Sequence, residues 1–288
     1  MNDLQHPAFP RLFRRTDRSR PSGPDPRRPD PRWLDASARL PATDGGFLGP
    51  RHHTLPPRDL RSRPQPHDRD DTDGRCGLGP IGLHIENGNT PRCPDIVTFF
   101  AQTAAFEGSQ TTICDGRAVW DLFDDPQKAR WSQPMTVERV LPEVLWKRYL
   151  ANEHPAISHP DEVTMEHVLQ FKAAVPGQDF EQHDDGALTY RLTVNPVRPS
   201  ALGGTDRGFA NAVLGPSHNY QPPRYAMADG SPVSADEIEE MRALAEKVTH
   251  EINWQDGDIA ILDNTRVMHG RRAIADANRN LFIGMGMI

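Results

Sequence analysis

Five residue types are missing from the first 76 positions, and this absence limits what that part of the chain can fold into. Residues 1–76 contain no Glu, Lys, Ile, Val or Tyr, types that make up roughly a quarter of ordinary globular sequence. The same residues include 15 Arg, 13 Pro and 11 Asp. Without β-branched aliphatic side chains, such a segment is poorly suited to strands or to an apolar core. We therefore expect residues 1–76 to be disordered and residues 77–288 to form the folded domain.

Two interpretations of residues 1–76 remain open. The segment is a natural Arg/Pro-rich arm, or it is translated from the wrong reading frame of a GC-rich gene. Arg, Pro, Asp, Gly and Ala have GC-rich codons, whereas Lys, Ile and Tyr do not. Asp is interspersed with the Arg, and the whole chain has a net charge of −7. We therefore expect no nucleic-acid partner.

The sequence favours a cytoplasmic protein without a membrane partner. It has no run of 18 apolar residues, and its first residues turn basic and Pro-rich without the apolar region of a secretory signal. The three cysteines, Cys76, Cys93 and Cys114, form no CxxC pair. This spacing indicates a reduced protein without a zinc site.

Beyond residue 77, hydrophobic patterning predicts a mostly β domain with inserted helices. Strands are expected within residues 95–106, 111–116, 187–197, 253–264 and 280–288. Residues 136–150 predict a helix kinked at Pro142, or a pair of helices. Residues 234–252 predict an amphipathic helix that opens with a capping box of Ser234 and Glu237.

A histidine and a glutamate lie two positions apart in "LHIEN", so His84 and Glu86 would share one face of a strand. This spacing alone is weak, because 12 histidines and 40 acidic residues in 288 positions predict about one or two such pairs by chance. The chain has two more, His159/Asp161 and His183/Asp185, but these lie in polar, turn-like segments. Only "LHIEN" is flanked by apolar residues.

The order of motifs resembles the Fe(II)/2-oxoglutarate-dependent dioxygenases of the taurine dioxygenase-like (TauD/TfdA) family. The matching segments are "LHIEN", "CPDIVTFF", "GSQT" at residues 108–111, "NWQDGDIAILDNTRVMHGRR" and Arg279. The last block is specific, whereas the HxE pair is not. Ser109 replaces the usual second glycine of "GSQT", and the early strands of the family are absent or replaced.

This resemblance implies a double-stranded β-helix core (jelly roll, cupin-like) and a set of site residues. His84, Glu86 and His269 would bind Fe(II), since two neutral imidazoles and one carboxylate suit that ion. Arg279 would bind the distal carboxylate of 2-oxoglutarate, and Thr111 would hydrogen-bond the same co-substrate. Other residues of the last block are interpreted as structural or supporting: Trp254, Gly257, Asp258, Asp263, Asn264, Arg266 and Arg271.

The implied reaction consumes O2 and 2-oxoglutarate, releases succinate and CO2, and oxidises an unactivated C–H bond of a small molecule. An amino acid or a natural-product intermediate is the expected substrate, by analogy. Glu86 argues against halogenation, because related halogenases have a small residue there. Two alternatives stay open: a non-catalytic or truncated remnant, and a cupin-like metal-binding protein without 2-oxoglutarate. Asn211, His218, Asn219 and Arg224 are candidate substrate contacts, and a purely structural role in the loop stays open for each of them.

Overall fold

The computed structural model describes residues 12–13, 78–153, 157–204, 206–215 and 222–288, which are mostly β with five α-helices. Most of the compositionally distinct segment, including Cys76, lies outside the described residues. Within it, Leu12–Phe13 form a two-residue strand, β1. A strand here differs from the expectation for residues 1–76. A short edge strand depends on main-chain hydrogen bonds, which need no β-branched side chain.

One antiparallel sheet has the strand order β1-β12-β3-β14. It contains β3 (Ile96–Thr103), β12 (Ile259–Asp263) and β14 (Asn280–Gly286). The expected strands within residues 95–106, 253–264 and 280–288 are thereby confirmed. Val97 and Ala101 of β3 are fully buried on the same face, as the two-residue period of a strand requires.

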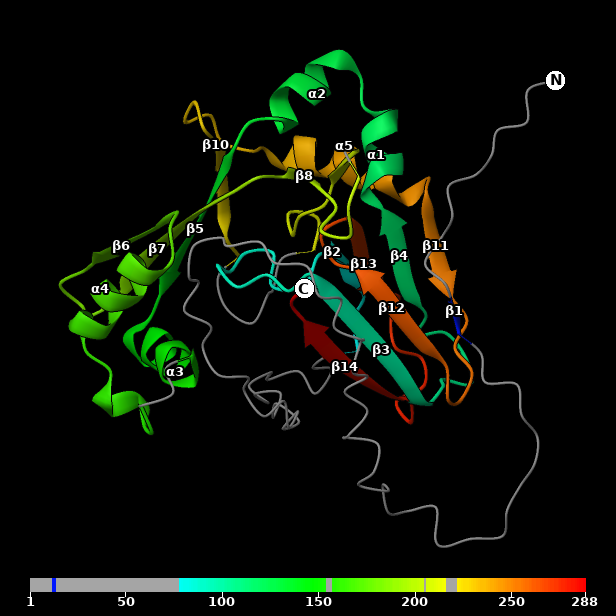
Figure 1. Ribbon diagram of the computed structural model, residues 1–288, viewed down its shortest axis with the longest axis horizontal. Coiled ribbons are helices and arrows are strands. Elements are labelled where there is room, and N and C mark those ends of the chain that lie inside the picture. The colour runs from blue at the N-terminus through cyan, green and yellow to red at the C-terminus, as the bar shows by residue number, and fades with distance from the viewer. Residues whose placement is uncertain (1–11, 14–77, 154–156, 205, 216–221) are drawn as a thin grey trace, which may run out of the picture. The chain divides into compact units, whose positions relative to one another are not determined.

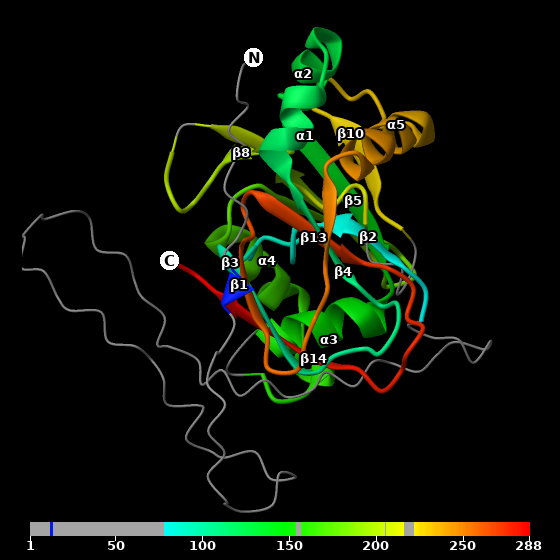
Figure 2. The same ribbon diagram turned by 90° about the vertical axis from the view of Figure 1, so that its right-hand side faces the viewer.

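A second antiparallel sheet has the order β11-β4-β13-β2, which the labels of Figure 1 follow, and Figure 2 shows β13, β4 and β2 after a turn of 90°. Its strands are β2 (Ile81–His84), β4 (Thr111–Asp115), β11 (Thr249–Ile252) and β13 (Val267–Arg271). Gly270 allows β13 to lie this close to β2, because a Cβ at this position would be 2.6 Å from the carbonyl oxygen of Ile81. The sheet therefore brings together segments that are far apart in the sequence.

A third sheet, β10-β5-β7-β6, corrects one prediction. Its strands are β5 (Met135–Leu141), β6 (Gln178–Gln182), β7 (Leu188–Val194) and β10 (Arg224–Met227). The helix predicted from residue 136 is wrong up to Leu141. The alternating segment "TVERVL" pairs along its whole length with β7, and Pro142 separates it from α3 (Glu143–Glu153). The strand expected within residues 187–197 is confirmed, and β8 (Val197–Pro199) pairs with β9 (Arg207–Phe209).

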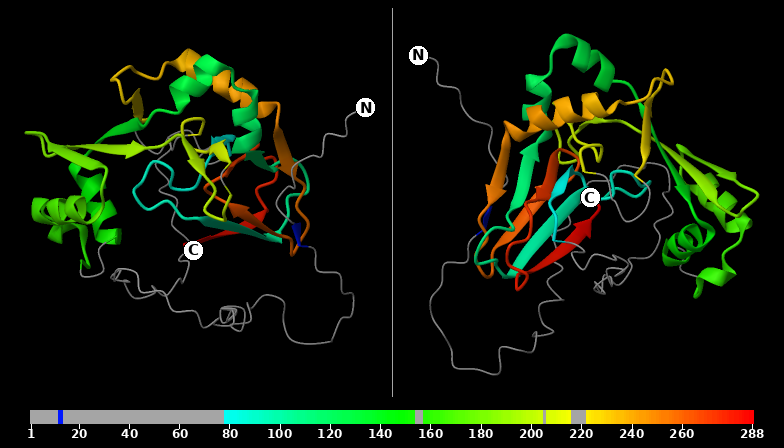
Figure 3. Two further views of the ribbon diagram at one scale, coloured as in Figure 1. Left: turned by 45° about the horizontal axis from the view of Figure 1, so that its top comes forward. Right: turned by 180° about the vertical axis from the view of Figure 1, so that it is seen from behind.

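The helices lie in two groups. Figures 1 and 3 show α1 (Gly116–Leu122), α2 (Asp125–Trp131) and α5 (Ala235–Glu246) at one end of the first two sheets. Near β5 to β7 lie α3, the 3-10 helix η2 (Pro160–Glu162) and α4 (Met165–Ala174). The predicted capping box of Ser234 and Glu237 is confirmed. The predicted helix ends earlier than residue 252, because residues 249–252 pair with β4.

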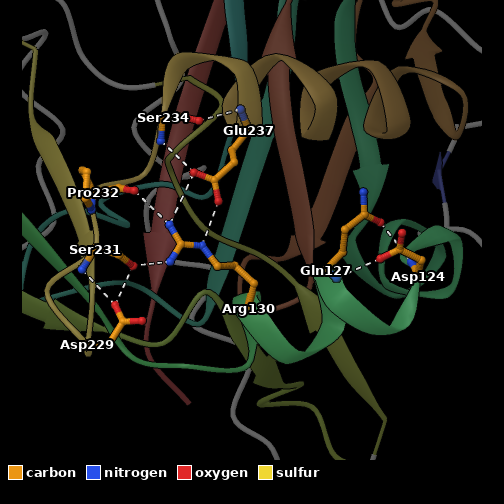
Figure 4. A network of polar contacts seen from close by, with 8 residues as sticks. All are labelled: Asp124, Gln127, Arg130, Asp229, Ser231, Pro232, Ser234 and Glu237. Atoms are coloured by element: carbon orange, nitrogen blue, oxygen red, sulfur yellow. Dashed lines mark hydrogen bonds and ion pairs between the residues drawn. The ribbon is translucent and has the colours of Figure 1, made fainter.

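Two clusters of buried apolar side chains form the core. The larger one joins β2, β4, α1, α2 and α5 with β5 and β10, and Trp131 packs edge-on against Phe209 with ring centroids 5.1 Å apart. The smaller one joins β5 and β7 with α3 and α4. Arg130 of α2 links α2 to the start of α5 through Glu237 and Ser231 (Figure 4). No helix in the described part of the chain is long and apolar enough to cross a bilayer.

Candidate metal centre

His84, Glu86 and His269 come together, as the sequence predicted. One ligand atom from each lies within 4.8 Å of the other two. The sheet register causes this, because His269 of β13 is the cross-strand partner of His84 of β2. The two imidazole centroids are 4.5 Å apart, and Nε2 of His269 lies 3.4 Å from Oε2 of Glu86. These side chains form the one group of three or more His, Cys, Asp or Glu residues that could hold a metal ion, among the residues described.

The surroundings of His84 leave Nε2 as the atom for a metal ion. Its Nδ1 lies 2.8 Å from the carbonyl oxygen of Gly82. A carbonyl only accepts, so Nδ1 carries the proton and Nε2 keeps its lone pair. Burial, with the neighbouring charge of His269, lowers the pKa of His84 to about 4. The imidazole is therefore neutral near pH 7, which is the form that binds metals.

Glu86 is held in its ionised form. Burial raises its pKa, but the hydrogen bond from His269 and the charges of both histidines outweigh burial, so the net pKa lies below the usual value. The candidate group thus combines two imidazoles and one carboxylate, a donor set that suits Fe(II) and other divalent transition metals.

Asn264 holds the main chain of Glu86 in place, a role that the sequence did not reveal. Its side-chain Oδ1 accepts the Glu86 N–H at 2.7 Å, and its Nδ2 donates to the Glu86 carbonyl at 3.1 Å and to the Pro94 carbonyl at 2.8 Å. Asn264 is fully buried. The sequence suggested only that Asn264 supports the strand of His269. Its contact with Glu86 spans 178 positions and has no local signal.

Phe99 is a second neighbour of the centre that sequence reasoning missed. Its ring lies edge-on to His269 with centroids 5.2 Å apart, and it also lies 6.4 Å from the ring of Trp254. Because edge-to-face ring pairs are energetically favourable, this contact favours the observed orientation of His269. The alternation of β3 was the available signal, since it places Phe99 on the same face as Val97.

The two residues predicted to bind the co-substrate lie close to Trp254. Trp254 donates its indole N–H to Thr111 Oγ1 at 2.9 Å. Trp254 and Arg279 both line a pocket of about 200 Å³. Arg279 donates to the carbonyl of Ser109, and burial lowers the pKa of Arg279. This pocket combines a half-buried guanidinium with hydrogen-bonding groups, so it can accept an anion.

The structure explains how a serine at position 109 is tolerated where the family usually has glycine. Its φ of 61° lies in the left-handed region, which favours glycine. Its hydroxyl compensates by accepting the N–H of Ala275 at 3.0 Å. The substitution thereby keeps the turn that presents the Ser109 carbonyl to Arg279.

The competing His-acid pairs have structural roles. His159 accepts the N–H of Asp161 at the start of η2, and His183 hydrogen-bonds the Thr189 hydroxyl at 2.6 Å. The two arginines of the last sequence block also have partners. Arg266 forms an ion pair with Asp115, and Arg271 donates to the carbonyl of Gly79 at 2.7 Å.

The expected substrate contacts have mixed outcomes. Asn211 is buried, and its side chain donates to the Pro196 carbonyl and accepts from the Val213 N–H. Both hydrogen bonds stabilise the main chain of the loop. Arg224 lies exposed at the start of β10. His218 and Asn219 lie outside the described residues.

Comparison with known proteins identifies the family. The model of the family described as "Taurine catabolism dioxygenase TauD, TfdA family" matches residues 45–285. This match begins within residues 1–76, and its first part, up to residue 77, lies outside the described residues. A curated relative, the dapdiamide synthesis protein DdaC of Enterobacter agglomerans, is 24% identical over 218 residues, which cover 67% of this chain and 61% of the relative. The chain thus spans about three fifths of the length of that relative.

Solved structures show weaker likeness. The PvcB protein from Pseudomonas aeruginosa has 13% identity and a TM-score of 0.44, over 75% of this chain and 60% of that chain. A taurine dioxygenase from Burkholderia xenovorans has 15% identity and a TM-score of 0.43, over 71% of this chain and 56% of that chain. Likeness of this size adds nothing to the identification. The family match spans most of the sequence and includes His84, Glu86 and His269, so the chain belongs to the taurine catabolism dioxygenase TauD, TfdA family.

Proposed function

We propose that this chain is a non-haem Fe(II)/2-oxoglutarate-dependent oxygenase that oxidises an unactivated C–H bond of a small molecule. Hydroxylation is the simplest outcome, with release of succinate and CO2. The observation that carries the proposal is the group of His84, Glu86 and His269, whose ligand atoms converge within 4.8 Å in a chain of this family. The two imidazoles and the carboxylate are the donors that a non-haem iron site requires.

The residues present fit Fe(II). His84 directs Nε2 away from the Gly82 carbonyl and toward the group, and its lowered pKa keeps it neutral near pH 7. Glu86 supplies the one negative charge, so Fe(II) in this group would keep a net charge of +1 that favours an anionic co-substrate. When bound, the iron and 2-oxoglutarate would supply the chemistry that activates O2. The chain would hold the ligands, orient the substrate and restrict water.

Arg279 and Thr111 are the proposed contacts of 2-oxoglutarate. A guanidinium matches the planar geometry of a carboxylate with two parallel hydrogen bonds. The Thr111 hydroxyl already accepts the Trp254 N–H, so its own proton remains available for donation to an anion. Trp254 thus orients Thr111 as a donor beside the pocket that Arg279 lines.

We interpret the core as the double-stranded β-helix expected for the family. The sheets β1-β12-β3-β14 and β11-β4-β13-β2 are both antiparallel, and each contains strands that are distant in the sequence. Strands β11 to β14, which follow one another in the chain, alternate between these two four-stranded sheets. This arrangement is typical of a jelly roll. The metal-binding group then lies on β2 and β13, with Phe99 of β3 contributed from the other sheet.

The expected substrate is an amino acid or a natural-product intermediate. The relative DdaC is named for dapdiamide synthesis, which supports a biosynthetic small molecule as the substrate class. Desaturation or ring closure would use the same ligands, so product analysis must distinguish them from hydroxylation.

An anaerobic titration tests the proposal. Addition of Fe(II) and 2-oxoglutarate to the protein should give a weak visible charge-transfer band, and His269→Ala should abolish it. His183→Ala is the matched control, because His183 hydrogen-bonds only within its own hairpin, and this variant should keep the band. Arg279→Ala should weaken 2-oxoglutarate binding strongly.

Absence of the band in well-folded wild-type protein would contradict the oxygenase assignment and favour a non-catalytic remnant. A band that survives Arg279→Ala at unchanged 2-oxoglutarate affinity would contradict the co-substrate assignment alone. Fe(II) binding without any effect of 2-oxoglutarate would favour a cupin-like metal-binding protein.

A further inference from the structure

One face of β14 carries apolar side chains that are only partly covered. Leu281, Ile283 and Met285 share this face, because alternate residues of a strand point to the same side. Ile283 is 40% exposed and Met285 is 41% exposed. Neighbouring apolar side chains that stay this open indicate a surface that binds another group.

Ile283 lies beside the proposed metal ligands. It is the cross-strand partner of Phe99 in β3, the strand next to β14 (Figure 1). Cross-strand partners point to the same face of a sheet, with Cβ atoms about 4.5–5.5 Å apart. The Phe99 ring in turn lies edge-on to His269 with centroids 5.2 Å apart. A group that packs on Ile283 and Phe99 would therefore be next to His269.

Met285 connects the same face of β14 to the segment of Glu86. Its Sδ atom accepts a hydrogen bond from the side-chain amide of Asn87 at 3.7 Å, and Asn87 directly follows Glu86. Asn87 has a φ of 55°, in the left-handed region that residues other than glycine seldom adopt. Two separate contacts, one through Phe99 and one through Asn87, thus place this face of β14 at the metal centre.

The same face continues into the pocket proposed for 2-oxoglutarate. Leu281 lines that pocket together with Arg279 and Trp254. Ile283 follows Leu281 by two positions on the same face, which is ~7 Å along a strand. A molecule that covers Ile283 and Met285 would therefore lie beside the co-substrate and would not displace it.

The side chains around Ile283 offer no partner to a charged group. On the faces that β14 and β3 share here, Leu281 pairs with Ala101, Ile283 with Phe99, and Met285 with Val97. All of these side chains are apolar, and the nearby Glu86 and His269 are assigned to the metal ion. An ion placed on this surface would lose hydration without a compensating charge, whereas an apolar group would gain from burial.

We propose that Ile283 and Met285 determine substrate specificity and bind an uncharged, apolar part of the substrate, such as an aliphatic or aromatic side chain. This inference rests on the proposed oxygenase function and specifies the substrate class of that site. Unactivated C–H bonds belong to groups of this kind. The surface would thus hold the type of bond that the reaction oxidises next to the proposed metal ligands.

The test uses the full chain, loaded anaerobically with Fe(II) and 2-oxoglutarate, and two separate measurements. The visible charge-transfer band reports on the iron site, and the shift of the thermal midpoint reports on probe binding. The apolar probes are L-norleucine, L-leucine and L-phenylalanine, and the polar probes of similar length are L-glutamate, L-glutamine and L-lysine. At least one apolar probe should raise the midpoint, and every polar probe should raise it less.

Ile283→Thr tests the role of the apolar surface. Threonine keeps the branched Cβ that suits a strand but replaces apolar surface with a hydroxyl. The Kd for the best apolar probe should therefore rise about 5-fold or more. Ile261→Thr is the matched control and should leave the Kd unchanged. Ile261 is 44% exposed and pairs with Thr98, so it lies on the opposite face of the same sheet.

Ile283→Lys tests the selectivity against charge. The new ammonium group should weaken binding of the apolar probes and should strengthen binding of L-glutamate. Such a gain of binding does not arise from a loss of folding. A variant that ranks the six probes as the wild type does would contradict the inference.

Three further results would overturn it: no apolar probe raises the midpoint, the polar probes bind as well as the apolar ones, or the two threonine variants share one Kd. An unchanged Kd for Ile283→Thr, together with a smaller oligomer in size-exclusion chromatography, would identify an interface between copies of the chain instead. A band without probe binding would contradict this inference alone. Probe binding that depends on Ile283, without the band, would contradict the proposed function alone.

Discussion

Replacing Asn264 with alanine should reduce both the stability of the fold and its affinity for the metal ion. The Asn264 side chain makes three hydrogen bonds to main-chain groups, two to Glu86 and one to the Pro94 carbonyl. Asn264→Ala removes all three and leaves the Glu86 N–H without its acceptor. The Glu86 carboxylate, a proposed metal ligand, would then be attached to a less restrained main chain.

The expected loss of stability follows from these contacts. Each hydrogen bond contributes a net ~0.5–1.5 kcal/mol, and a buried group left unpaired costs ~1–3 kcal/mol. Because Asn264 is fully buried, water does not replace the lost partners freely. We expect Asn264→Ala to lower the free energy of unfolding by about 3 kcal/mol. By analogy with residues that orient metal ligands, Fe(II) affinity should fall about 10- to 100-fold.

Urea unfolding of the metal-free protein measures the first effect, and an anaerobic Fe(II) titration of folded protein measures the second. Asn211→Ala is the matched control. Asn211 is also buried and makes two hydrogen bonds through its side chain, but these go to Pro196 and Val213 and not to Glu86 or the histidines. The control should lose a similar amount of stability and keep its Fe(II) affinity.

Equal Fe(II) affinities for Asn264→Ala and the wild type would refute the reasoning, whatever the loss of stability. A parallel loss of Fe(II) affinity in Asn211→Ala would also refute it, because general loosening of the fold would then explain both variants.

Three further variants, one of them with a control variant, test separate contacts. Asp115→Asn should cost about 1–3 kcal/mol near pH 7. Burial raises the Asp115 pKa, but hydrogen bonds from Arg266 and Arg117 bring the net pKa below its usual value of 3.8. The difference between the urea-unfolding free energies of wild type and variant should therefore shrink as the pH falls below that value, and a constant difference would contradict the assignment. Arg130→Ala should lower the same free energy by about 1 kcal/mol, because half-buried Arg130 joins α2 to α5 (Figure 4), whereas Arg242→Ala at an exposed pair should change it by less than about 0.5 kcal/mol. His159→Asn should leave the Fe(II) titration unchanged, and a loss of affinity would mean that the wrong His-acid pair was rejected.

Local patterns in the sequence predicted the parts of the fold that neighbouring residues determine. The capping box of Ser234 and Glu237 and the strand at residues 96–103 follow from residues within one turn or one short run. The segment at residues 136–141 was wrongly predicted as helix because six residues of mixed polarity suit both periods. Pairing with β7 decided its conformation. The strand at residues 249–252 likewise depended on its partner, β4.

The sequence by itself determined which side chains were candidates for the metal ion, since "LHIEN" and "MHGRR" combine suitable ligands with apolar strands. Only the tertiary structure decided that His84 and His269 lie opposite each other, that Asn264 holds Glu86, and that Asn87 meets Met285. These contacts join residues 178 to 198 positions apart, and their geometry depends on strand register. Register is set by packing over the whole sheet, so no short stretch of sequence contains it.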